Sequence, residues 1–133
     1  MKKAELKASE AAVLHVTVGE TLAQAGARAA AAMKALHAGQ PVDSYFGVSF
    51  AQVGQMFAAF TPRRWELIAG LREHGPLTVA ELARLLGRNY KNVHTDVAQL
   101  AQWLAVERDA DGRVSVPWAE IIVDMKLPQR QAA

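Results

Sequence analysis

The sequence predicts an α+β fold, on three observations. First, 51% of the 133 residues are apolar, enough for a core, and 15 Lys and Arg nearly balance 13 Asp and Glu. Second, short stretches near both ends alternate apolar and polar residues as strands do, whereas the middle carries apolar residues at helical spacing. Third, hydroxyl residues, prolines and glycines stand where helices would begin and end.

The composition argues against several classes of protein. The chain has no cysteine, which removes disulfides and thiolate sites and favours a reducing, cytoplasmic setting. Its charged start lacks the apolar stretch of a signal peptide, and no apolar run is long enough to span a membrane. The four histidines are scattered, and no catalytic set of acids, bases or nucleophiles stands out. We therefore expect a soluble, cytoplasmic protein without metal, cofactor, membrane contact or enzymatic activity.

The N-terminal half alternates between strand and helix patterns. Apolar residues at every second position predict strands over 12–18 and 45–50. The alanine-rich stretch between them predicts a helix over about 20–37. Ser49, with a glutamine three positions later, resembles a capping box that opens another helix over about 50–59.

The predicted helix over 20–37 carries a stripe of small and apolar residues at steps of four and three. Such a stripe suits close packing of a helix against another surface. We expect it to form the interface of a homodimer, together with the predicted N-terminal strand over 12–18 and the predicted C-terminal strand over 119–127. Its members are Leu22, Gly26, Ala29, Met33 and Leu36.

Three helices are predicted in the second half. Thr61-Pro62 is a hydroxyl cap followed by proline at the first helical position, and this helix stops at Gly75-Pro76. Thr78 to Glu81 forms a capping box for a short helix that ends at Gly87. After a three-residue turn, a longer helix runs from about Tyr90 to residue 103 or 104.

A hairpin is predicted next, with strands over 105–108 and 113–116 joined by a turn rich in aspartate. Three helices with a short turn between the second and third, followed by a hairpin, have the order of a winged helix-turn-helix domain. The predicted organisation is a disordered tail at 1–10, a strand–helix–strand–helix extension at 11–60, the winged helix-turn-helix domain with its β-hairpin wing at 61–117, a strand at 118–127 and a tail at 128–133.

In such a domain the third helix enters the major groove of DNA. Here Val93, Val97, Leu100 and Leu104 share one face and are expected to pack inward, and Asp96 is expected to turn toward this side. The opposite face presents amide, hydroxyl, imidazole and ammonium groups, which can bond base edges. The predicted base-reading residues are Lys91, Asn92, His94, Thr95 and Gln99.

Positive charge gathers around the turn that precedes this helix, since 82–95 contains three basic residues and no acid. Arginine side chains and helix N-termini bind phosphates. The predicted phosphate-binding residues are Arg63, Arg64, Thr78, Arg84, Arg88, Asn89 and Tyr90, and Arg108 and Arg113 are expected to contact DNA from the wing. The alternative for Arg84 is that it is solvated or pairs with Glu81. The alternative for the wing arginines is that neighbouring acids neutralise them.

Three segments carry a family resemblance: TPRRWEL at 61–67, HGPLTVAELA at 74–83 and GRNYKNVHTDV at 87–97. They resemble small prokaryotic winged-helix proteins of the MarR-like type. The resemblance implies a DNA-binding transcriptional regulator. Some such proteins are antitoxins of TumE-type toxins, which implies repression of their own operon and direct neutralisation of a toxin. It places Arg88, Asn89, Tyr90, Lys91, Asn92, His94 and Thr95 at the turn and the start of the reading helix.

Our leading hypothesis is a homodimeric, sequence-specific repressor that binds double-stranded DNA, with a cognate toxin as a further expected partner. Two copies would read two half-sites and add their binding energies. The competing hypothesis is a protein-interaction module in which the winged helix is only a scaffold. A third, a regulator that senses a small ligand, requires a pocket.

Overall fold

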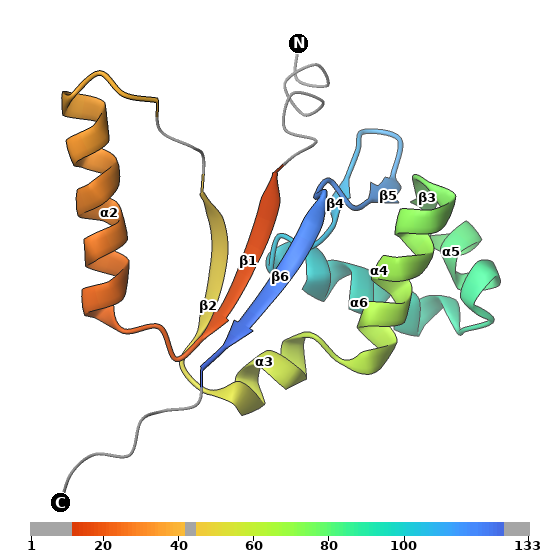
Figure 1. The fold of residues 1–133 in the computed structure, drawn as a ribbon. Helices are drawn as coiled ribbons and strands as arrows, with labels where there is room; N and C mark the ends of the chain where they lie inside the picture. Colours follow the sequence, from red (N-terminus) through yellow and green to blue (C-terminus); the bar gives the residue numbers. More distant parts are fainter. Residues whose placement is uncertain (1–11, 42–44, 127–133) are drawn as a thin grey trace, which may run out of the picture.

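A computed structural model describes residues 12–41 and 45–126, so the predicted tails at 1–10 and 128–133 lie outside the described residues. A three-stranded sheet with one long helix beside it adjoins a group of helices with a second small sheet (Figure 1). This mixed architecture confirms the α and β content predicted for the chain. The elements are β1 (Val13–Val18), α2 (Leu22–His37), β2 (Phe46–Phe50), α3 (Val53–Ala59), α4 (Pro62–His74), β3 (Leu77–Thr78), α5 (Val79–Leu86), α6 (Tyr90–Gln102), β4 (Glu107–Arg108), β5 (Arg113–Ser115) and β6 (Glu120–Met125).

The larger sheet has the order β2-β1-β6, and both neighbours run parallel to β1. Leu14, Val16 and Val18 on β1 are buried, as their alternation predicts. Because residues paired across a sheet lie on the same face, Ile121 and Val123 share this inner face. The C-terminal strand thus pairs with the N-terminal one and joins both ends of the described chain.

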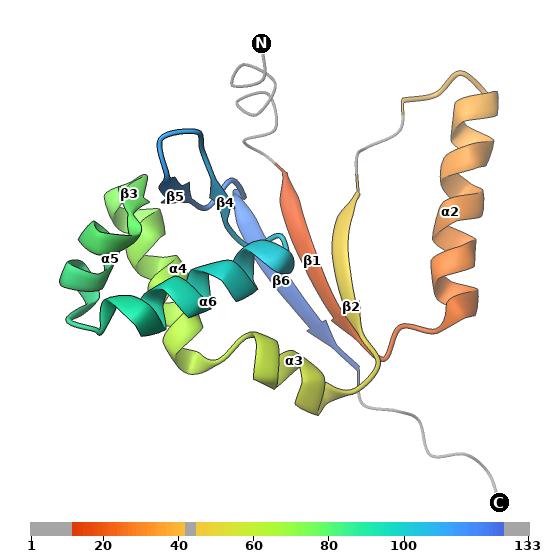
Figure 2. The same cartoon turned by 180° about the vertical axis from the view of Figure 1, so that it is seen from behind.

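Helix α2 makes the crossover from β1 to β2, as a parallel pair requires. It begins with a capping box in which the Thr21 hydroxyl accepts a hydrogen bond from the Gln24 N–H. None of its residues is buried. Seen from behind, α2 stands apart from the other helices, beyond β2 (Figure 2).

The predicted ends of α4 and α5 and the predicted start of α6 are confirmed. The Thr61 hydroxyl caps α4, and Thr78 and Glu81 form the capping box of α5. Gly87 ends α5 with a φ of 64°, a left-handed conformation that glycine adopts without strain. The side chain of Asn89 caps α6.

Three local predictions are wrong. Helix α3 begins at Val53 under a Gln52–Gln55 capping box, and Ser49 instead stays in β2, where its hydroxyl lies 2.7 Å from that of Thr17. Helix α6 ends at Gln102, and Leu104 has a φ of 68° and is exposed, so it does not extend the buried stripe. Strand β4 is shorter than predicted because only Glu107 and Arg108 pair with β5, while Ala105 and Val106 precede it as buried core residues.

The core is one cluster of buried residues that runs from the large sheet into the helices. The Phe60 ring, fully buried between α3 and α4, meets Phe50 of β2 edge to face and stacks on Trp65 of α4. The predicted regions at 11–60 and 61–117 therefore share their hydrophobic interior. Within 12–41 and 45–126, no helix has both the length and the apolar character to cross a membrane.

Candidate nucleic-acid interface

The outward face of α6 is polar and carries no exposed carboxylate. Val93, Val97 and Leu100 are buried against the other helices. The exposed side chains on the remaining faces include all five predicted base-reading residues, Lys91, Asn92, His94, Thr95 and Gln99. The Thr95 hydroxyl donates to the Lys91 carbonyl at 3.1 Å, which leaves its oxygen free to accept a hydrogen bond.

Asp96 is the one acid on α6, and two arginines hold it inward. Arg64 Nε of α4 lies 2.9 Å from Asp96 Oδ1, and Arg88 Nη2 from the turn lies 2.7 Å from Oδ2. All three side chains are only 13–14% exposed. Arg64 Nη1 also donates to the carbonyl oxygens of Ala58 and Ala59 at the end of α3. This cluster joins α3, α4, α6 and the turn before α6.

The cluster corrects the prediction that Arg64 and Arg88 are surface phosphate contacts. Both guanidinium groups point to Asp96, because a carboxylate on the inner side of a helix needs a counter-charge once it leaves water. A signal for this arrangement was present in the sequence: Asp96 is predicted on the core side, and such an acid requires a cation. Its partners lie 32 and 8 positions away in the chain.

Three other predicted phosphate-binding residues stand at helix starts. The Asn89 side chain accepts hydrogen bonds from the Lys91 and Asn92 N–H groups. The Thr78 hydroxyl accepts from the Glu81 N–H at 3.1 Å. Tyr90 is exposed, with its ring tilted against that of His94 at 6.0 Å. The first two side chains are thus engaged in capping, although the Thr78 hydroxyl proton remains available.

The wing arginines are exposed on a hairpin that forms part of the second sheet, of order β3-β5-β4. Arg113 Nη1 lies 3.2 Å from Glu81 Oε1 on α5, and both side chains are well exposed. The backbone N–H of Thr78, with additional help from Arg113, lowers the pKa of Glu81 below its ordinary value. Arg113 is thus paired with Glu81 of α5, and not with the neighbouring acids of the hairpin that the predicted alternative named.

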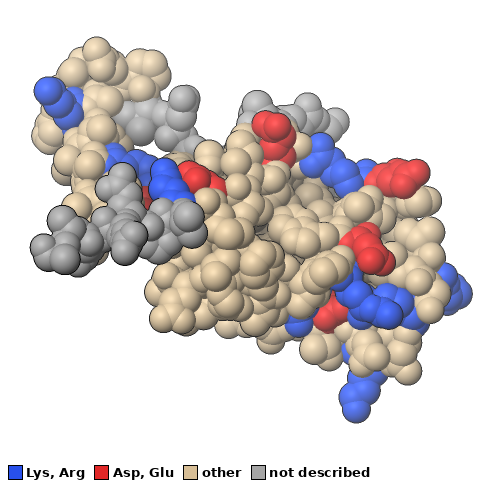
Figure 3. Space-filling model, turned by 60° about the horizontal axis from the view of Figure 1, so that its bottom comes forward, with Lys and Arg blue, Asp and Glu red and all other residues tan. Residues whose placement is uncertain are grey.

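Exposed positive charge near α6 comes from Arg63, Arg84 and Lys91. Seen from below, charged side chains gather over the helical part on the right, whereas the central surface carries none (Figure 3). Helix α3 has no charged residue and exposes Val53 and Phe57. Gln99 lines a pocket with Gln55 and Ala58 of α3, so it sits beside this uncharged surface.

The predicted dimerisation stripe on α2 is exposed along its length. Leu22 is 90% exposed, and Met33 and Leu36 are 57% and 62% exposed. Gly26 and Ala29 are exposed as well. The half-buried residues of α2 are Ala25, Ala32 and Ala35, which lie on a neighbouring face of the helix.

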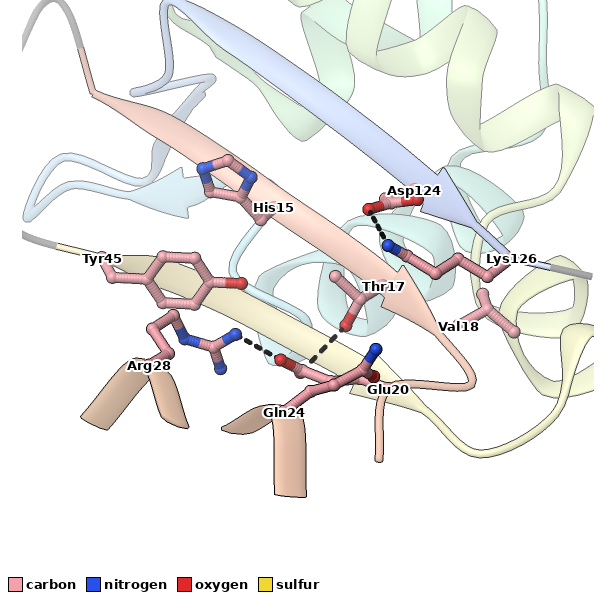
Figure 4. A pocket seen from close by; sticks show the side chains of 9 residues that line it. All are labelled: His15, Thr17, Val18, Glu20, Gln24, Arg28, Tyr45, Asp124 and Lys126. Carbon is pink, nitrogen blue, oxygen red and sulfur yellow. Dashed lines mark hydrogen bonds and ion pairs between the residues drawn. The ribbon is translucent and has the colours of Figure 1, made fainter. Parts of the chain in front are cut away.

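A polar pocket lies between the start of α2 and the outer face of the large sheet (Figure 4). The Arg28 guanidinium lies 4.1 Å from the centre of the Tyr45 ring, which stacks on His15. Arg28 also pairs with Glu20, and this hydrogen bond lowers the pKa of the Glu20 carboxyl. Within the described ranges, no group of three or more His, Cys, Asp or Glu residues could hold a metal ion.

A family model described as HVO_A0114 matches residues 59–123. The match spans α4 to β6, which includes all of α6 and the hairpin. No curated protein and no solved structure matches the chain. The resemblance to MarR-like regulators and the pairing with a toxin stay predictions.

Proposed function

We propose that residues 61–117 form a winged helix-turn-helix domain and that the protein is a sequence-specific transcriptional regulator that binds double-stranded DNA through α6. The proposal rests on the exposed face of α6, which carries no carboxylate. The one acid of this helix, Asp96, is paired with Arg64 and Arg88 on the inner side. An exposed acid there would repel phosphates. The order of α4, α5, α6 and the hairpin supports the same assignment.

The first two turns of α6 supply the base contacts in this proposal. Asn92 can form two hydrogen bonds with an adenine through its amide, and the Thr95 methyl group can contact a thymine methyl. Lys91 lies beside them and, as an exposed ammonium group, contacts a phosphate in this proposal. Arg63 and Arg84 contact the phosphates of the DNA backbone in this proposal, and Arg108 contacts them from the wing. All three side chains are exposed.

Replacing Asn92 by Ala is expected to weaken binding to the preferred duplex by about 1–3 kcal/mol and to leave binding to a random duplex unchanged, because a base contact is lost. Fluorescence anisotropy measures this with the DNA upstream of the protein's own coding region and with a scrambled duplex of the same length. Gln40→Ala, an exposed amide in the loop after α2, is the matched control. Equal losses on both duplexes would contradict base reading by Asn92.

Replacing Lys91 by Ala is expected to weaken binding to both duplexes similarly and to reduce the slope of log K against log salt by roughly one unit, because one phosphate contact is lost. Arg28→Ala, a cation of α2 that pairs with Glu20 and lies outside the exposed stripe, serves as the control and should leave the slope unchanged. If the unmodified protein binds neither duplex at low salt, the proposal fails and the protein-interaction module takes its place.

A further inference from the structure

The large sheet is parallel, yet its outer face is open along β6. Parallel sheets are normally covered on both faces. The inner face packs on the core, whereas Ile122, which points outward, is 42% exposed. Glu120 and Asp124 flank it on the same face and are also exposed. The outer row of β6 is therefore an apolar residue between two acids, and Asp124 is already paired with Lys126 at 3.5 Å, so the negative charge that this row offers comes from Glu120.

Helix α2 has the complementary surface. Its stripe of Leu22, Met33 and Leu36 is exposed, and it is about 21 Å long at 1.5 Å per residue. Lys34 and His37 are exposed on one flank of the stripe, and α2 contains no acid. The helix thus presents apolar side chains bordered by Lys34, which matches apolar Ile122 with Glu120 beside it.

We infer that two copies of this chain form a dimer in which the exposed stripe of α2 from each copy packs on the outer face of β6 of the other. The two complementary surfaces belong to one chain, so a two-fold axis satisfies both at once and leaves neither unpaired. Lys34 of one copy then approaches Glu120 of the other. The proposed DNA-binding function requires two copies related by a two-fold axis, and this interface would hold them together. The dimer itself forms without DNA.

The first experiment measures the mass of the full chain by light scattering and its dissociation constant by sedimentation. The unmodified protein is expected to be a dimer at micromolar concentration. Met33→Lys is expected to raise the dissociation constant roughly tenfold or more, because it buries a charge in the apolar contact. Ala31→Lys, on the opposite side of α2 and also exposed, adds the same charge and should leave the dimer intact. A monomeric wild type, or equal effects of both variants, overturns the inference.

The second experiment identifies the surfaces that meet, and it exploits the absence of cysteine from the chain. One chain carries Met33→Cys and another Ile122→Cys, and the two are mixed under mild oxidation. A covalent heterodimer should form faster than either homodimer. If Met33→Cys alone cross-links as fast as the mixture, α2 packs on α2 instead and the docking on β6 is refuted.

DNA binding is measured on the same samples, so the two proposals fail separately. A monomer that still binds the upstream duplex overturns the interface alone. A dimer that binds no DNA overturns the proposed function alone.

Discussion

Replacing Asp96 by Asn is expected to lower the free energy of unfolding by about 3 kcal/mol, because it removes the counter-charge of two largely buried arginines. Removing one partner of a buried ion pair costs about 3–5 kcal/mol, and the 14% exposure of Asp96 places the expected loss at the lower end. The amide keeps the shape of the side chain, so the loss reports charge rather than a cavity. Urea unfolding followed by circular dichroism measures it.

Asp111→Asn is the matched control, since Asp111 is exposed in the hairpin turn and undergoes the same chemical change. Its expected effect on stability is below about 0.5 kcal/mol. If Asp96→Asn is as mild as this control, the arginines are not held by Asp96. Arg64 and Arg88 would then again be candidates for phosphate binding at the surface.

The Asp96 cluster also separates the features that the sequence predicts from those that it does not. The helix ends around it follow from local chemistry: Thr78 with Glu81, Gly87 and Asn89 each act within a few residues of their own position. The ion pairs of Asp96 join residues far apart in the chain, and no periodicity encodes such a pairing. The face of α6 was predictable, whereas the direction of two arginine side chains was not.

The large sheet shows the same limit. Alternation correctly predicts strands near both ends of the chain, and it assigns Ile121 and Val123 to one face. It does not say that β6 pairs with β1, nor that α2 stands so far aside that none of its residues is buried. The exposure of the predicted stripe is therefore a finding of the structure, and it leaves this surface available to a second copy of the chain.

Replacing Phe60 by Ala is expected to cost about 4 kcal/mol of unfolding free energy, because the ring is fully buried and a cavity replaces it. Phe57→Ala, in α3 three positions earlier, removes a ring that is 55% exposed and should cost less than about 1 kcal/mol. Thermal unfolding followed by far-ultraviolet circular dichroism and by tryptophan fluorescence measures both variants.

The two signals of Phe60→Ala should shift together in one transition. Phe60 lies between Phe50 of the large sheet and Trp65 of α4, so its loss weakens the contact through which the two parts share one core. If the predicted extension at 11–60 and the domain at 61–117 folded separately, the helices would keep their melting temperature while the sheet unfolded first. A single shifted transition means instead that the sheet is part of the scaffold that positions α6.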